Sequence, residues 1–195
     1  GRGPHPRCAG NAPEGHDGWP GMSTDALDAS RDIDRDVPDR DVPDRAPRAA
    51  LGEPALLDLV AARHQGVLAT VKKDGRPQLS NVLYAWDPEE GVARVSVTAD
   101  RAKTRNAARD PRVSLHVSAE DFAGYAVVEG DAELSAVALD PHDAAADELV
   151  ATYRAATGGE HPDWEEFRRA MVADRRQVLR VRATKVYGMA RLPRP

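Results

Sequence analysis

Three segments with the alternating pattern of β-strands follow one another closely between residues 66 and 98. They are expected at 66–71, 77–86 and 92–98, and the connections between them are too short to hold a helix. The first connection contains Asp74-Gly75, a dipeptide typical of a tight hairpin. Parallel strands need a long crossover, usually helical, whereas antiparallel strands do not. The sequence therefore predicts an antiparallel meander, and a small barrel in preference to a doubly wound parallel sheet.

The rest of the domain adds strands and a few helices. Apolar residues at helical spacing predict a short helix over 53–64, and a second helix starts after Asp100 and ends at Asp110-Pro111. Further strand patterns cover 113–118, 125–134 and 177–189, and two helices over 141–157 and 162–173 are separated by Gly158-Gly159. The predicted fold class is α+β, mainly β, with at least five strands and a helical insertion.

The first fifty residues differ in composition from the remainder. They are dense in Gly, Pro, Asp and Arg, and they repeat one pentamer twice over 36–45. Such a segment has too little apolar surface to offset the entropy lost on ordering. We expect a disordered N-terminal extension over 1–50 and a single folded domain over 51–195. The role of the extension stays open, as does the choice of Met22 as the translation start.

Charge, cysteine content and hydropathy argue against several classes of protein. The formal net charge of −5 argues against nucleic acid as the main partner. Cys8 is the sole cysteine, and His64, His116, His142 and His161 fall in different elements without metal-ligand spacing, so no metal site is expected. No segment reads as a membrane span or a secretory signal, which predicts a cytoplasmic protein with no membrane partner.

The start of the helix after Asp100 is the strongest candidate site. The first N–H groups of a helix lack intrahelical partners and carry the positive end of its dipole, so they favour an anion. Arg101, Lys103 and Thr104 add a guanidinium, an ammonium and a hydroxyl there. This pattern predicts a phosphate site, although a basic surface helix with no ligand has the same sequence.

Gln78, Ser80 and Asn81 place polar side chains on the second predicted strand. They could contact the edge of a bound ring or simply face solvent, and the pattern leaves both readings open. No Gly-x-Ser-x-Gly elbow accompanies the serines, so Ser-His-Asp chemistry is not indicated. No catalytic residue is assigned.

Several motifs in order resemble the pyridoxamine-phosphate-oxidase-like split-barrel superfamily. They are Gly66–Thr70, Asp74–Asn81, Arg101–Asn106 and Asp110–Arg112. Later motifs at 129–130, 159–164, 171–176 and 186–188 resemble one branch, the deazaflavin-dependent oxidoreductases of actinobacteria (flavin/deazaflavin oxidoreductase group B). A coding bias toward Arg over Lys, with Ile33 as the sole isoleucine, is typical of GC-rich genomes such as those of actinobacteria.

The resemblance implies a six-stranded antiparallel split β-barrel that forms a homodimer, with a flavin-like cofactor in each groove at the subunit interface. It implies that the cofactor phosphate is held by Arg101, Lys103 and Thr104, with Asn106 nearby. The ring is then expected against two strands, which carry Gln78, Ser80, Asn81, Ser96, Val97 and Thr98.

The chemistry implied by the resemblance belongs to the cofactor. Reduced coenzyme F420 passes a hydride to a conjugated small-molecule acceptor, such as a biliverdin-like tetrapyrrole or a quinone. One alternative keeps the fold and uses FMN, and another is a non-catalytic carrier of flavin, deazaflavin or tetrapyrrole. Both cofactors contain phosphate, so Arg101 and Lys103 cannot distinguish them. The deazaflavin also has a longer glutamyl tail, which needs further cationic contacts, and Lys72, Lys73 and Arg76 are the candidates for these.

Overall fold

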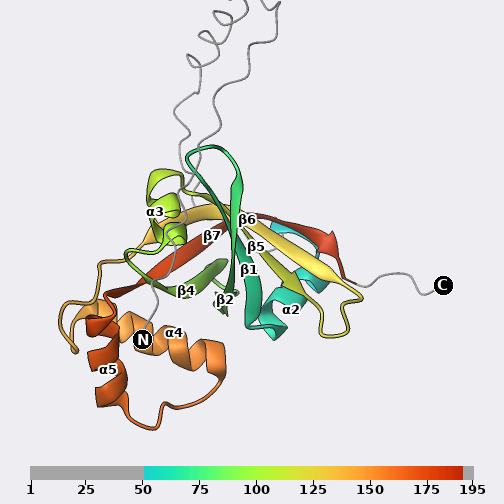
Figure 1. Cartoon of the computed structure of the whole chain (residues 1–195). Helices are drawn as coiled ribbons and strands as arrows, with labels where there is room; N and C mark the ends of the chain where they lie inside the picture. Colours follow the sequence, from blue (N-terminus) through green and yellow to red (C-terminus); the bar gives the residue numbers. More distant parts are fainter. Residues whose placement is uncertain (1–50, 191–195) are drawn as a thin grey trace, which may run out of the picture. The chain divides into compact units, whose positions relative to one another are not determined.

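The computed structural model describes residues 51–190, which form a seven-stranded antiparallel sheet with four helices (Figure 1). The strands are β1 (Gln65–Val71), β2 (Pro77–Leu83), β3 (Ala85–Asp87), β4 (Val92–Thr98), β5 (Arg112–Ser118), β6 (Tyr125–Leu134) and β7 (Arg176–Met189). The helices are α2 (Pro54–Ala62), α3 (Ala102–Arg109), α4 (Ala144–Thr157) and α5 (Trp164–Ala173). The predicted antiparallel, mainly β fold is confirmed.

The order of the strands shows that the sheet curls back on itself. The order is β2-β1-β5-β6-β7-β4-β3, so β2 and β3 lie at opposite ends. These two strands are separated along the chain by Tyr84 alone. Ends joined by a single residue must lie close together, so the sheet has the curl of a split barrel.

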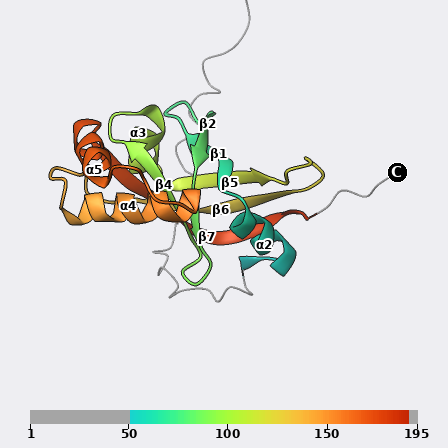
Figure 2. The same ribbon diagram turned by 90° about the horizontal axis from the view of Figure 1, so that it is seen from below.

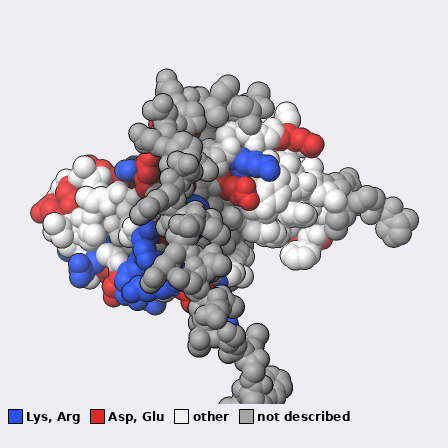
Figure 3. Space-filling model, turned by 90° about the horizontal axis from the view of Figure 1, so that it is seen from above, with Lys and Arg blue, Asp and Glu red and all other residues white. Residues whose placement is uncertain are grey.

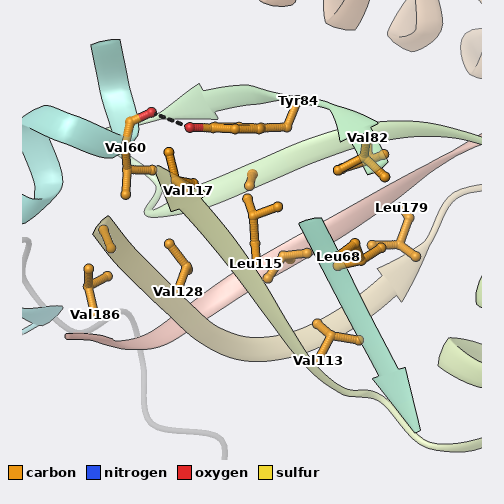
Figure 4. Packing of buried hydrophobic residues seen from close by; sticks show 14 of the residues in the cluster. Val60, Leu68, Val82, Tyr84, Val113, Leu115, Val117, Val128, Leu179 and Val186 are labelled. Atoms are coloured by element: carbon orange, nitrogen blue, oxygen red, sulfur yellow. Dashed lines mark hydrogen bonds between the residues drawn. The ribbon is translucent and has the colours of Figure 1, made fainter. Parts of the chain in front are cut away.

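The prediction of one continuous strand over 77–86 is wrong, and the structure therefore has seven strands instead of six. Up to Leu83 the chain pairs with β1, and from Ala85 it pairs with β4. Tyr84 makes the corner between them. Its ring is fully buried, its N–H donates to the carbonyl of His64 (2.9 Å), and its hydroxyl donates to the carbonyl of Val60 (2.7 Å; Figure 4). These contacts fix Tyr84 inside the barrel, and the strand predicted over 77–86 is therefore interrupted at this residue.

The barrel interior is filled by the alternating apolar residues of the strands. Leu68, Val95, Leu115 and Val128 are all buried in one cluster, part of which Figure 4 shows. Helix α2 adds Val60 and its neighbours to the same cluster, and it lies at the opposite end of the sheet from α4 and α5 (Figure 2). Burial of this kind is the main source of stability in a domain of this size.

Helices α4 and α5 form a second, smaller layer against β7. Leu149, Met171 and Val178 bury their side chains in a separate apolar cluster between them. The two helices begin at 144 and 164, later than the predicted 141 and 162, because the side chains of Asp143 and Asp163 cap them. Each carboxylate accepts a hydrogen bond from a backbone N–H in the first turn, at 2.7 and 2.9 Å respectively.

The predictions made for residues 1–50 lie outside the residues that the structure describes. Within 51–190, none of the helices combines the length and the hydropathy that crossing a membrane requires.

Replacing Tyr84 by phenylalanine tests the corner. Burial raises the pKa of the Tyr84 hydroxyl, which therefore stays protonated and able to donate. Loss of the Tyr84 hydroxyl leaves the Val60 carbonyl without this donor. We therefore expect the free energy of unfolding, measured by urea denaturation, to fall by about 1–3 kcal/mol. The control, Tyr125→Phe at an exposed tyrosine, should change it by less than about 0.5 kcal/mol. Equal effects of the two changes would contradict the role of the corner.

Candidate functional site

Three residues separate the end of β4 from the start of helix α3, at the point where the sequence predicts a phosphate site. Arg101 is the residue before the helix; its backbone is extended (φ −74°, ψ 153°) and no side chain caps it. Its N–H donates to the carbonyl of Thr98 (3.3 Å). The N–H groups of the first helical turn have no carbonyl within the helix to bind, so they remain available to an anion.

Arg101, Lys103 and Arg176 crowd positive charge at the start of α3. Burial, followed by the charges of Arg101 and Arg176, lowers the pKa of Lys103. Figure 3 shows Lys and Arg side chains gathered over this helix. Among residues 51–190, no carboxylate pairs with Arg101 or Lys103. We call these three residues the cationic cluster; its donors and its unbalanced charge suit a phosphate group.

Arg176 was not found by sequence reasoning. It is the first residue of β7, and it pairs in register with Thr98 at the end of β4. Its Nη1 donates to the hydroxyl of Ser96 (3.3 Å), and its Nε donates to the exposed carboxylate of Asp174 (3.2 Å). The sequence held no local signal for this placement, because Ser96 and Arg176 are 80 residues apart.

Thr104 joins the helix to the strand before it. The residue is only 2 % exposed, and its hydroxyl donates to the carbonyl of Thr98 (2.8 Å). The single hydroxyl proton is therefore used within the chain. This contact fixes the start of α3 and so positions its N–H groups beside the cationic cluster.

Asn106 is buried and belongs to a chain of hydrogen bonds that reaches β2. Its Nδ2 donates to the hydroxyl of Thr70 (3.1 Å), which donates to Oε1 of Gln78 (3.1 Å). Nε2 of Gln78 donates in turn to the hydroxyl of Ser80 (2.7 Å). Arg109 donates to Oδ1 of Asn106 (3.2 Å) at the other end. The structure thus brings Asn106, Gln78 and Ser80 together through Thr70, a residue that the sequence analysis did not single out.

Asn81 lies apart from the other predicted residues of β2. Gln78 and Ser80 share the face of Val82, which is buried in the core, whereas Asn81 is exposed on the opposite face. Asn81 lines a cavity on this opposite side, which Arg63 and His116 also line. A ligand on one face of β2 therefore contacts Gln78 and Ser80 or Asn81, but not all three side chains.

The predicted residues of β4 also divide between two faces. The side chain of Val97 is buried in the core, so it presents only backbone to a ligand. Ser96 and Thr98 are half-buried on the opposite face, beside Arg176. The cationic cluster therefore continues into a polar strip formed by these two residues of β4.

A basic hollow of about 750 Å³ lies between the β1–β2 hairpin and α3. Its charged lining includes Lys72, Lys73, Arg105 and Arg109. Lys72 pairs with Asp74 (3.5 Å) and Arg109 donates to the carbonyl of Val71 (2.6 Å), whereas Lys73 makes neither kind of contact with any described residue. Arg76, which the sequence also suggested, does not line this hollow.

No three His, Cys, Asp or Glu side chains within residues 51–190 lie close enough to hold a metal ion. The chemistry that this geometry supports directly is the binding of an anion, first at the cationic cluster and then along the basic hollow.

Known proteins share this fold. The sequence model described as pyridoxamine 5'-phosphate oxidase matches residues 53–190. A solved structure described as an F420 reductase is 28% identical, with a TM-score of 0.52 over 70% of this chain and 98% of that chain. A conserved hypothetical protein from Mycobacterium tuberculosis is 24% identical, with a TM-score of 0.56 over 77% of this chain and 95% of that chain.

A heme binding protein from Mycobacterium smegmatis is 22% identical, with a TM-score of 0.52. The match covers 77% of this chain but only 57% of that one. At such identities, the two mycobacterial structures bear on the fold alone.

Lys103→Met tests whether repulsion within the cationic cluster lowers the stability of the folded protein. Because the pKa of Lys103 is lowered in the folded state, folding disfavours its charged form, and a neutral side chain removes that penalty. We expect the variant to be more stable to urea, by roughly 0.5 kcal/mol at low salt and by less at high salt. The control Lys185→Met, on β7, should not increase the stability to urea. A loss of stability in Lys103→Met would contradict the idea that repulsion within the cationic cluster is destabilising.

Proposed function

Because the chain belongs to the pyridoxamine 5'-phosphate oxidase family, we propose that it is an oxidoreductase that uses reduced coenzyme F420 to deliver a hydride to a conjugated small-molecule acceptor. The observation that carries the proposal is the cationic cluster, in which Arg101 and Lys103 have no carboxylate partner among residues 51–190. Similarity to the protein described as an F420 reductase supports the choice of cofactor.

A phosphate group fits the cationic cluster on physical grounds. Like charges held close together raise the free energy of the protein unless an anion offsets them. Lys103 is half-buried, and charges shielded from water interact more strongly than exposed ones. The N–H groups at the start of α3 add neutral donors to the same anion. Arg101, Lys103 and those N–H groups are therefore the residues that we propose hold the cofactor phosphate.

The basic hollow favours the deazaflavin over FMN. Both cofactors contain a phosphate, but coenzyme F420 continues beyond it into a glutamyl tail with several carboxylates. Ala102, between Arg101 and Lys103, lines the hollow together with Lys73 and Arg105, so basic side chains continue from the phosphate position. A tail of carboxylates suits such a lining, whereas FMN leaves it unused.

The protein's contribution to the chemistry is placement and shielding. The bound cofactor supplies the hydride, so no catalytic triad is needed. Ser96 and Thr98 offer a polar strip for the edge of the ring system, beside Arg176. The acceptor, a tetrapyrrole or a quinone, must reach the same strip, because hydride transfer requires contact between donor and acceptor.

We propose that two copies of the chain associate through the outer face of β2. This strand lies at an end of the sheet order, and its Leu79 and Leu83 are 63% and 56% exposed. Large apolar side chains on an edge strand favour contact with another chain. A second copy that covers them completes the groove in which the cofactor ring lies.

A titration of the purified protein with coenzyme F420 and, separately, with FMN tests the proposed cofactor. We expect submicromolar binding of coenzyme F420 and much weaker binding of FMN, followed by fluorescence anisotropy. Lys103→Ala should lower the affinity for coenzyme F420 by about 10- to 100-fold, because it removes a charge-assisted contact to phosphate. Lys185→Ala is the matched control and should bind normally.

Other results of the titration have distinct meanings. Tighter binding of FMN would place the protein with the FMN-dependent oxidoreductases. Tight binding of coenzyme F420 with no turnover of any conjugated acceptor would indicate a carrier. Unchanged affinity in Lys103→Ala would contradict the phosphate site itself.

Lys73→Ala separates the glutamyl tail from the phosphate. The variant removes a cation of the basic hollow and leaves the cationic cluster intact. We expect the affinity of the variant for coenzyme F420 to fall by about 3- to 10-fold at low salt, while its affinity for FMN stays the same. An equal loss for both cofactors, measured in the same titration, would show that Lys73 does not contact the tail.

A further inference from the structure

A cavity of about 240 Å³ lies between α4, α5 and the sheet. Strands β2 and β4 contribute Leu83 and Ser96 to its lining, and β7 contributes Arg176. Figure 2 shows α4 and α5 on the side of the sheet formed by β4 and β7. Ser96 belongs to the polar strip proposed for the edge of the cofactor ring, and Arg176 lies beside that strip. The cavity is therefore continuous with the proposed cofactor site.

The two helices give the cavity an apolar wall that includes two aromatic rings. Helix α4 contributes Leu149, Tyr153 and Ala156, and α5 contributes Phe167 and Met171. The ring centroids of Tyr153 and Phe167 lie 5.1 Å apart, and the two rings are inclined at 63°. We call these two rings the aromatic wall. Aromatic side chains favour flat conjugated molecules, because rings attract one another beyond the area that they bury.

Two further rings hold the aromatic wall in place from behind. Trp164 lies edge-on to Tyr153 and Phe167, with centroids 5.7 and 5.5 Å away, and His161 lies 5.5 and 5.2 Å from the same two rings. The guanidinium of Arg154 stands over the Trp164 ring, 4.5 Å from its centroid. Neither Trp164 nor His161 is part of the lining. The wall is thus ordered by its own neighbours before any ligand binds, which lowers the entropy lost on binding.

We propose that this cavity holds the acceptor of the hydride, and that the acceptor is an uncharged quinone of one or two rings. The inference rests on the proposed function, because the acceptor must touch the cofactor ring beside Ser96. A cavity of about 150 Å³ holds benzene, whereas pockets for drug-sized ligands measure roughly 300–1,000 Å³. The volume here lies between the two, so it suits one or two rings, and a four-ring tetrapyrrole is too large.

The charge of the lining also favours a neutral acceptor. Among the described residues that line the cavity, Arg176 alone is charged, and it already donates to Ser96 and Asp174. A biliverdin-like tetrapyrrole carries propionate carboxylates, which would lose their hydration against the apolar wall. A quinone has no such charge. When a quinone takes up a hydride and a proton, both released by the reduced coenzyme, it becomes the hydroquinone, and two electrons pass from the coenzyme to the quinone.

Menadione, a two-ring quinone, tests the proposal without and with coenzyme F420. Titrated alone into the full-length protein, menadione should quench the fluorescence of Trp164, which lies behind the aromatic wall, and the quenching should saturate at roughly submillimolar concentration. Trp164→Phe should abolish this saturable quenching. With reduced coenzyme F420 as the donor, we expect kcat/KM for menadione to exceed that for biliverdin by at least about tenfold. A higher kcat/KM for biliverdin, or no saturable quenching by menadione, would overturn the proposal.

Two pairs of variants place menadione in this cavity. Ala156→Leu fills part of the cavity and should raise the KM for menadione at least about tenfold, whereas Ala155→Leu, at an exposed neighbour outside the lining, should not change it. Phe167→Leu removes one ring of the aromatic wall and should raise the KM by about 3- to 10-fold. Phe122→Leu is its matched control, because Phe122 is 79% exposed and lies outside the lining.

The affinity for coenzyme F420, measured by fluorescence anisotropy, separates this inference from the proposed function. All four variants should bind coenzyme F420 as the unaltered protein does, which also shows that they fold. Normal binding of coenzyme F420 with an unchanged KM for menadione in both Ala156→Leu and Phe167→Leu would overturn the inference alone. Failure of the unaltered protein to bind coenzyme F420 would contradict the proposed function, and the acceptor site with it.

Discussion

Closure of the curled sheet by residues 77–87 is the constraint on which the rest of the structure depends. Strands β2 and β3 follow each other directly, yet they pair with β1 and β4 toward opposite ends of the strand order. Tyr84 turns the chain between them, and its hydroxyl ties the corner to α2. With the sheet held in this curl, α3 packs beside the β1–β2 hairpin, where the hydrogen bonds of Asn106 and Thr70 join helix to sheet. The candidate site is thus a consequence of closure.

The distribution of charge differs between the outside of the sheet and the candidate site. On the outside of the sheet, arginines are paired: Arg180 makes two hydrogen bonds with Glu148, and Arg182 makes two with Glu133. At the start of α3, Lys103 has cations for neighbours and a lowered pKa. Like charges this close repel one another, and the arrangement becomes favourable when an anion binds.

Local patterns predicted most of the secondary structure, and they failed where a distant contact overrode them. The run 77–86 alternates like one strand, but burial of Tyr84 breaks it. Arg101 and Lys103 were found because the start of a helix has a sequence signature. The site assignments remain predictions, and the structure adds what each side chain already does. Thr104 donates within the chain, and the side chain of Val97 lies in the core.

The sequence by itself determined the antiparallel fold class, the helix that follows β4 and the family resemblance, because these depend on neighbours along the chain. Only the tertiary structure decided which distant residues meet. Arg176 reaches Ser96 across 80 residues, and Asn106 reaches Thr70 across 36. The cavity lined by α4 and α5 likewise forms only once these helices have packed on the sheet. Such contacts follow from the register and curl of the sheet, and no short stretch of sequence encodes these.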